Sequence, residues 1–155
     1  MSYTLTRVFR CHLMAAMTKT FLAWCAGFFD GEGCVMLVRR QRTQNYVEHT
    51  VTAVIGQKRQ APLVEIQKQF GGVLTKLTTS GCYQWRAHGS TAESFFKKIR
   101  PHLRLKGDEV DCALELRKTV KKHGNRLKVG VWAKREEIWK KFRAFRESQY
   151  VLLPS

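Results

Sequence analysis

Hydrophobic and polar residues follow a helical period in some stretches of the chain and a two-residue alternation in others. The longest apolar run spans residues 21–29; the capping hydroxyl of Thr18 precedes it, and Gly31 and Gly33 follow it. This arrangement predicts a helix that the two glycines bring to an end. Because the run is apolar on every side, the helix must be covered all round, either by its own domain or by another subunit.

One face of this predicted helix has almost no side chains. Ala23, Gly27 and Gly31 recur every four residues and therefore lie on the same face. Such a face lets a second helix backbone approach closely, so we expect a helical neighbour there.

Two stretches of alternation, residues 35–37 and 47–55, predict a β-hairpin that is joined by the polar segment 39–45. In the second stretch the odd-numbered residues are the apolar ones, with His49 as the polar exception. The polar side chains of Glu48 and Thr50 point to the opposite face. One face of this hairpin is therefore expected to be buried and the other open.

Further helices separate and follow the hairpins. They are predicted at 62–70, from a capping box at 90–93 to Pro101, at 108–123 and at 133–147, and a second hairpin with its turn at Ser80 and Gly81 covers 73–88. The order αββαββα, followed by a C-terminal helix, predicts an α+β fold with a four-stranded antiparallel sheet and helices on one face. We divide the chain into an N-terminal extension (1–17), a core domain (18–124) and a basic C-terminal linker and helix (125–155).

The open face of this sheet combines basic and hydrogen-bonding side chains. If odd-numbered positions face the helices on all four strands, the open face carries Met36, Val38, Arg40, Arg42, Glu48, Thr50, Thr52, Lys76, Thr78, Gln84 and Arg86. Arg, Gln, Lys and Thr on a twisted ribbon can meet base edges and phosphates in a DNA major groove. The residues of these four types are therefore candidate DNA-binding residues, although an ordinary solvated sheet face has the same composition.

Charge and composition narrow the class of partner. The 155 residues have a formal net charge of +16 and a pI near 10.1, and 44% of them are hydrophobic. That apolar content supports a folded core and argues against a disordered basic tail. The charge favours nucleic acid as the partner, with an acidic membrane surface second. The apolar run 21–29 is too short to cross a membrane, which takes roughly 20 residues.

The cysteines and the N-terminal segment bear on location. Five cysteines occur without a C-x-x-C pair, which favours reduced intracellular thiols over a zinc cage or a disulfide framework. Residues 1–17 contain Arg7 and Arg10, several hydroxyl residues and no acid. They are consistent with an organelle transit peptide or with a simple extension before Met17.

The segment 25–33, CAGFFDGEG, resembles the signature of the LAGLIDADG homing endonucleases. Ala26, Gly27, Asp30 and Gly33 match it directly, and Glu32 stands in place of the second acidic residue. The resemblance extends over residues 20–123, because the αββαββα order, Gln57 after the second strand and the sequence LRLK at 103–106 occur at similar spacing in single-motif members. It implies a saddle-shaped sheet and a homodimer in which two motif helices pack through Ala23, Gly27 and Gly31.

The resemblance also implies roles for particular residues. Glu32 and the Gly31 carbonyl would bind Mg²⁺, which prefers hard oxygen ligands. Lys106 would hold the attacking water or offset charge at phosphorus, and Gln57 would position that water. Asp30 would organise the helix end through hydrogen bonds to the backbone, in a structural or supporting role. The family's active-site arginine has no clear counterpart; Lys58 or Arg59 are the substitutes at hand.

Two classes of function remain open at this stage. The first is a homodimeric, Mg²⁺-dependent endonuclease that cuts both strands of a long pseudo-palindromic DNA site and has neither a small-molecule substrate nor a membrane partner. The second is a non-cleaving nucleic-acid binder, either an RNA maturase that aids intron splicing or a DNA-binding regulator. The first reading places the protein inside the cell with its DNA, in a bacterial, phage or organellar compartment.

Overall fold

The structure is a computed structural model that describes residues 17–44, 46–123 and 129–150. Its elements, in chain order, are α1 (Lys19–Glu32), β1 (Gly33–Thr43), β2 (Tyr46–Gln57), α2 (Gln60–Phe70), β3 (Val73–Lys76), β4 (Tyr83–His88), α3 (Gly89–Ile99), a 3₁₀ turn (Arg100–His102), α4 (Gly107–His123) and α5 (Val129–Tyr150). The predicted αββαββα order is confirmed, and α4 and α5 correspond to the two helices predicted after it at 108–123 and 133–147. The N-terminal extension, apart from Met17, lies outside the described residues, as does much of the expected C-terminal linker.

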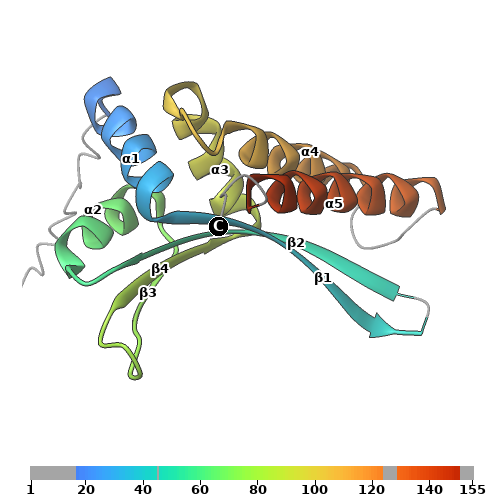
Figure 1. The fold of residues 1–155 in the computed structure, drawn as a ribbon, viewed down its shortest axis with the longest axis horizontal. Helices are drawn as coiled ribbons and strands as arrows, with labels where there is room; N and C mark the ends of the chain where they lie inside the picture. The colour runs from blue at the N-terminus through green and yellow to red at the C-terminus, as the bar shows by residue number, and fades with distance from the viewer. Residues whose placement is uncertain (1–16, 45, 124–128, 151–155) are drawn as a thin grey trace, which may run out of the picture.

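The four strands form one antiparallel sheet in the order β1-β2-β4-β3. The sheet arches, and the helices all lie on its convex side (Figure 1). The predicted arrangement of helices on one face, with the other face open, is thereby confirmed. Below, the open face is called the concave face.

Helix α1 begins as predicted and ends later than predicted. The Thr18 hydroxyl accepts a hydrogen bond from the backbone N–H of Phe21 at 3.1 Å, which caps the first turn. Gly31 lies within the helix, and the chain enters β1 directly at Gly33. A Cβ at position 33 would lie 2.2 Å from a ring carbon of the fully buried Phe29, so only glycine fits this close passage.

The first hairpin and the last helix are longer than the sequence pattern predicts. Residues 39–43, expected to form a polar strand end and the start of the turn, all belong to β1 and pair with β2 except at a register shift between Gln41 and Thr43. They are polar and mostly exposed, so they lack the alternation on which the prediction rested. Residues 129–132, expected to form a linker, are the first turn of α5.

The side chains of β3 face the opposite sides of the sheet from those predicted. Partners across antiparallel strands share a face, and Leu74 pairs with the buried Trp85 while Lys76 pairs with Tyr83. On β3 the even-numbered residues therefore face the helix side, and Thr75 faces the concave side opposite Gln84. Lys76 does not belong to the concave face, and its ammonium lies 5.7 Å from the centre of the Tyr83 ring.

Two smaller predictions in this half of the chain are also wrong. Thr78 was expected on a strand and lies in the turn between β3 and β4. Ser90 was expected to cap α3, but the residue before the helix is His88, and its side chain makes no cap. The Glu93 carboxylate is buried and faces Lys97 at 2.8 Å and Arg117 at 3.4 Å instead of the helix start.

The core lies between the sheet and the helices and is rich in aromatic rings. Phe95 of α3 stands edge-on to Phe29, Phe70 and Trp85, with ring centres 4.9–5.5 Å apart. The Trp85 indole N–H donates to the Gly71 carbonyl at 2.8 Å, so its one polar atom is satisfied. These contacts fix α1, α2 and α3 to one another and to β4, on the side of the sheet that Trp85 faces.

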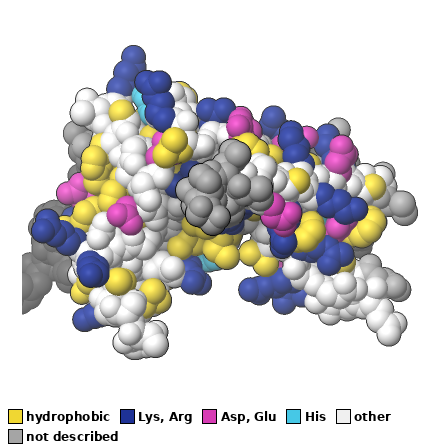
Figure 2. Space-filling model, viewed as in Figure 1, with side chains coloured by type: hydrophobic (Ala, Val, Ile, Leu, Met, Phe, Trp, Pro, Cys, Tyr) yellow, Lys and Arg dark blue, Asp and Glu magenta, His cyan; other side chains and the backbone are white. Residues whose placement is uncertain are grey.

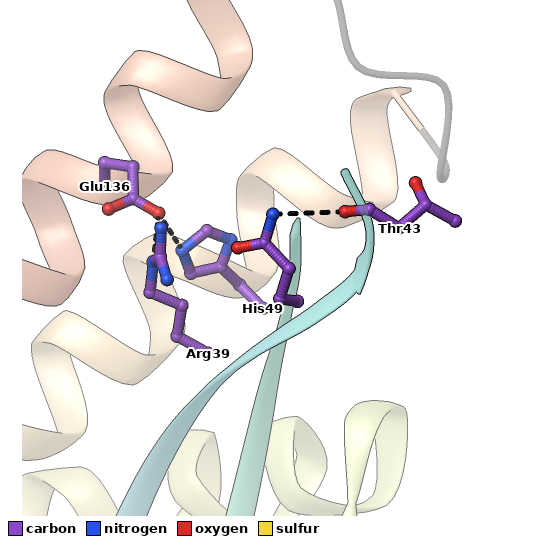
Figure 3. A network of polar contacts seen from close by, with 5 residues as sticks. Arg39, Thr43, His49 and Glu136 are labelled. Atoms are coloured by element: carbon purple, nitrogen blue, oxygen red, sulfur yellow. Dashed lines mark hydrogen bonds and ion pairs between the residues drawn. The ribbon is translucent and has the colours of Figure 1, made fainter. Parts of the chain in front are cut away.

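Helix α5 is attached to the first hairpin by a polar contact. The Glu136 carboxylate lies 2.8 Å from Nε of Arg39 on β1 and 3.0 Å from Nε2 of His49 on β2. Figure 3 shows both side chains facing Glu136 from the strands below. Arg135 is buried beside it and donates to the hydroxyl and the carbonyl of Thr119 on α4. The polar exception in the β2 pattern, His49, is therefore explained by a partner from α5.

Candidate catalytic centre and nucleic-acid interface

The C-terminal end of α1 is held by the buried carboxylate of Asp30. Its two oxygens accept hydrogen bonds from the backbone N–H groups of Arg104, Leu105 and Lys106, at 2.7, 3.2 and 3.0 Å. Three backbone donors on one carboxylate make a strong, oriented anchor. The anchor joins the end of α1 to the loop that precedes α4.

This anchor places the side chains of Lys106 and Glu32 at the same end of the helix. The Lys106 ammonium donates to the backbone carbonyl of Asp30 in the last turn of α1. Glu32, the final residue of the helix, is exposed. A helix end leaves its last carbonyls without donors from its own helix, so the oxygens of this turn are available to other groups.

Gln57 approaches the same region from the sheet. Gly33, the first residue of β1, pairs with Ile55, so Gln57 lies two residues beyond this pair at the end of β2. Its amide oxygen accepts a hydrogen bond from the Lys58 backbone N–H at 2.7 Å. Lys58 and Arg59 follow directly and are exposed. The structure thus brings the candidate residues Asp30, Glu32, Lys106 and Gln57 to one end of the sheet.

In the part of the chain that the structure describes, side chains alone do not form a metal site at this place. Among residues 17–44, 46–123 and 129–150, no group of three or more His, Cys, Asp or Glu side chains could hold a metal ion. Glu32 and the backbone oxygens of the last helical turn are nevertheless hard ligands of the kind that Mg²⁺ takes. Because Mg²⁺ keeps several bound waters, an ion here would complete its ligands with water and with oxygens of a second chain or of a phosphate.

The concave face carries most of the predicted polar side chains. Arg40, Arg42 and Arg86 are exposed, Thr50 and Gln84 are half-buried, and Thr52 is buried beneath its hydrogen bond to His88 at 2.9 Å. Arg42 pairs with Glu48 at 2.6 Å, and Arg86 donates to the Gln84 amide oxygen at 2.6 Å. Figure 2 shows Lys and Arg side chains on either side of a hydrophobic patch beneath the arch.

Two residues of this face were not among the DNA-binding candidates predicted from the sequence. Thr75 takes the place assigned to Lys76, because β3 has the opposite phase. His88 pairs with Thr52 across the strands and also faces the concave side. The even number of His88 was enough to place it on this face. The four residues of β3 are too few to indicate which of them face the helices.

No described residue of the chain covers the small-residue face of α1. Ala23, Gly27 and Gly31 are exposed, and Trp24 beside them keeps 38% of its surface accessible. A Cβ added at Gly27 or Gly31 would meet nothing within 4 Å. The described residues of this chain therefore do not cover α1 on every side, which leaves cover by another subunit as the other expected possibility.

Solved structures with a similar fold include several homing endonucleases. I-CvuI in complex with the I-CreI target superposes with a TM-score of 0.69 at 23% sequence identity, over 79% of this chain and 80% of that one. The archaeal intron-encoded I-Vdi141I complexed with DNA gives a TM-score of 0.70 at 14% identity, over 79% and 82%. The LAGLIDADG homing endonuclease I-SmaMI bound to cleaved DNA gives 0.64 at 12%, over 76% of this chain and 42% of that one.

No protein-family profile matches the sequence, and no curated protein matches it either. The fold is nevertheless that of the LAGLIDADG homing endonucleases, as the motif at residues 25–33 indicates. Within the described ranges, no helix is both long and apolar enough to cross a membrane.

Proposed function

We propose that the protein is a homing endonuclease that binds double-stranded DNA on its concave face and hydrolyses one phosphodiester in each strand as a homodimer. The observation that carries this proposal is the cluster of Asp30, Glu32 and Lys106 at the exposed end of α1. The hydrogen bonds between Asp30 and the loop before α4 hold Lys106 at the end of α1, where Glu32 also lies. Such a protein acts inside the cell on the DNA that carries its target.

A divalent metal fits this proposal through the oxygens at the end of α1. Glu32 and the Gly31 carbonyl would hold Mg²⁺, together with the second Glu32 of the dimer and oxygens of the DNA phosphate. The similar I-CvuI was studied with Mg and with Ca in complexes with DNA. When bound, the ion would lower the pKa of a water and offset negative charge at the phosphate.

The chain's own residues would prepare the phosphate and the water. The Lys106 ammonium, tethered to the Asp30 carbonyl, supplies a positive charge for the phosphorane that develops in the transition state. Gln57 can orient the water through its amide, with Lys58 or Arg59 adding charge from the following exposed segment. Asp30 does not touch the reacting atoms, because its oxygens are taken up by the backbone N–H groups of the loop.

DNA recognition would use the concave face of the sheet that the two hairpins form. Arg40, Arg42 and Arg86 would contact phosphates or guanine edges, while Thr50, Gln84 and Thr75 offer hydrogen bonds to bases. Thr52 is buried and would act by supporting His88. Thr78, in the turn between β3 and β4, would contact the DNA backbone. Lys76 has no part in this surface, because it faces the other side of the sheet.

The decisive experiment is cleavage of duplex DNA that contains the intron-insertion site of the host, with Mg²⁺ and with the metal removed by chelator. The wild-type protein should cut both strands, and the Glu32→Gln variant should bind the duplex with cleavage reduced by about 10³-fold or more. Glu65→Gln, the same change at an exposed position on α2, should leave both binding and cleavage unaltered.

Binding by the wild type without cleavage under any divalent metal would overturn the nuclease proposal. It would favour the non-cleaving alternative, a maturase or DNA-binding regulator of the same fold. Binding to the structured intron RNA in preference to the duplex would then identify the maturase.

A further inference from the structure

A pocket of about 470 Å³ opens at the point where β4 ends and β2 continues with β1 as its remaining partner strand. β2 pairs with β4 only from Thr52 onward, so among the described strands its residues 46–51 pair with β1 alone. The pocket is continuous with the concave face on one side and reaches α3, α4 and α5 on the other. It lies away from the end of α1, and its lining includes none of the candidate catalytic residues.

The lining of this pocket is strongly cationic. Its charged side chains are those of Arg40, Arg86, Arg117, Arg135 and Glu48. The one carboxylate among them lies 2.6 Å from Nε of Arg42, which is outside the lining. Four arginines and one glutamate therefore line the cavity, and the glutamate is already paired. Three of the arginines also contact protein groups: Arg86 the Gln84 amide, Arg117 Glu93 and Arg135 Thr119. The excess of positive charge in the lining still favours an anion.

A helix start adds to this positive charge. Helix α3 begins at Gly89 in the pocket wall, has no side-chain cap and has no acid in its first turn. A Cβ at Gly89 would lie 3.8 Å from Nη1 of Arg117, so a guanidinium lies against the positive end of the helix. The Glu93 carboxylate, outside the pocket lining, lies 3.4 Å from Nε of Arg117 and offsets part of this positive charge. An anion in the pocket would offset the rest.

A buried, unsatisfied side chain lines the same pocket. His49 is only 5% exposed, and its Nδ1 makes no hydrogen bond to any described residue. Nε2 lies 3.0 Å from Glu136 but outside good hydrogen-bond geometry. A buried imidazole nitrogen without a partner is costly, and a ligand oxygen or its bound water in the pocket would satisfy it.

We propose that this pocket binds a phosphate group of the DNA backbone, at a distance from the bonds that are cut. Phosphate suits the site because guanidinium forks and helix N–H groups both recognise its oxygens. The site would anchor the duplex where the sheet narrows from four strands to two. This inference rests on the proposed DNA-binding function, but its first test needs no DNA.

The first test measures the binding of inorganic phosphate to the full chain by titration calorimetry. Arg117→Gln should weaken phosphate binding about tenfold, since it removes a hydrogen bond from a charged donor. Arg117→Lys keeps the charge and should retain most of the affinity. Lys118→Gln is the matched control, because it removes the same charge from the next, exposed position of α4 and should change nothing. Thermal melting shows whether each variant is folded.

The second test asks whether the phosphate comes from DNA. The affinity for a mixed-sequence duplex is measured against salt concentration. Arg117→Gln should reduce the slope of log K against log salt by about 0.9 for each DNA phosphate that the variant no longer neutralises. Lys118→Gln should leave the slope as in the wild type.

The outcomes separate this inference from the proposed function. Equal phosphate affinity in folded wild type and Arg117→Gln would overturn the pocket as an anion site, whatever the protein does to DNA. Phosphate binding that depends on Arg117, combined with an unchanged DNA salt slope, would assign the pocket to a free phosphate and overturn its role in holding the DNA backbone. Both results leave the cleavage test of Glu32 untouched.

Discussion

At the scale of single residues, burial decides which side chains keep their ordinary chemistry. Cys25 on α1 is fully buried, and burial, with a smaller contribution from Glu65, raises the pKa of its thiol to about 12. Burial also raises the pKa of the Cys112 thiol. Cys34 and Cys82 are only half-buried. Because the thiolate is the reactive form, these four cysteines of the described residues should differ widely in reactivity.

We expect iodoacetamide at about pH 8 to modify Cys34 and Cys82 in the native protein and to leave Cys25 and Cys112 unmodified. The buried thiols stay protonated and shielded, whereas the others reach solvent. Peptide mass spectrometry after labelling, with and without denaturant, measures this. Native labelling of Cys25 at the rate seen in denaturant would show that α1 is not packed as described.

Residue patterns also show how far the sequence can predict the site. Asp30, Glu32 and Lys106 could be placed from the motif and its spacing, because a helix end and a short loop fix them. The resemblance implied that Asp30 bonds to the backbone, but its three donors, the N–H groups of Arg104, Leu105 and Lys106, follow from tertiary structure. The uncapped start of α3 was hidden by Ser90 and Glu93, whose spacing imitates a capping box.

At the scale of elements, two strands depart from their sequence patterns for physical reasons. β3 is short, and Gly71 and Gly72 before it both have positive φ, so the chain reverses there without preserving the expected phase. Residues 39–43 extend β1 because β2 pairs with them, although they bury little apolar surface. The order of elements survives because each was supported by a longer hydrophobic pattern.

The contact of α5 with the first hairpin should depend on pH through His49. Burial lowers the pKa of the imidazole, and the opposing attraction of Glu136 does not cancel this effect. The unfolded chain therefore binds a proton at higher pH than the folded one, so His49 destabilises the fold as pH falls below about 6.5.

Urea unfolding between about pH 7 and pH 5 should show a smaller loss of stability in His49→Gln than in the wild type. His102→Gln, at a partly exposed position outside this contact, is the control and should follow the wild type. Parallel pH profiles for wild type and His49→Gln would contradict the buried, neutral state of His49.

At the scale of the whole molecule, the charge of +16 and the exposed small-residue face of α1 have opposite effects on dimerisation. Like charge opposes the association of two copies, while an apolar helix face with two open glycines favours it. Bound DNA would offset the repulsion, because the duplex carries the opposite charge. We therefore expect the dimer to be more stable on DNA than alone.

Gly27→Leu tests the dimer, because the added side chain enters open space in the single chain and would block a second helix. Sedimentation with duplex DNA should show loss of the two-chain complex and thus a drop of more than about tenfold in DNA affinity. Gly130→Leu, at an exposed glycine of α5 with equally open surroundings, is the matched control. A two-chain complex that persists in Gly27→Leu would exclude this face as the interface.

The direct junction between α1 and β1 has a consequence for the length of the DNA site. Glu32 ends the helix and Gly33 begins the strand, and Phe29 packs against that glycine, so no hinge separates them. In the proposed dimer, the angle and distance between the two sheets would then be set by the helix pairing alone. The spacing between the two half-sites becomes a fixed property of the fold. A base pair inserted between them would turn one half-site away from its sheet.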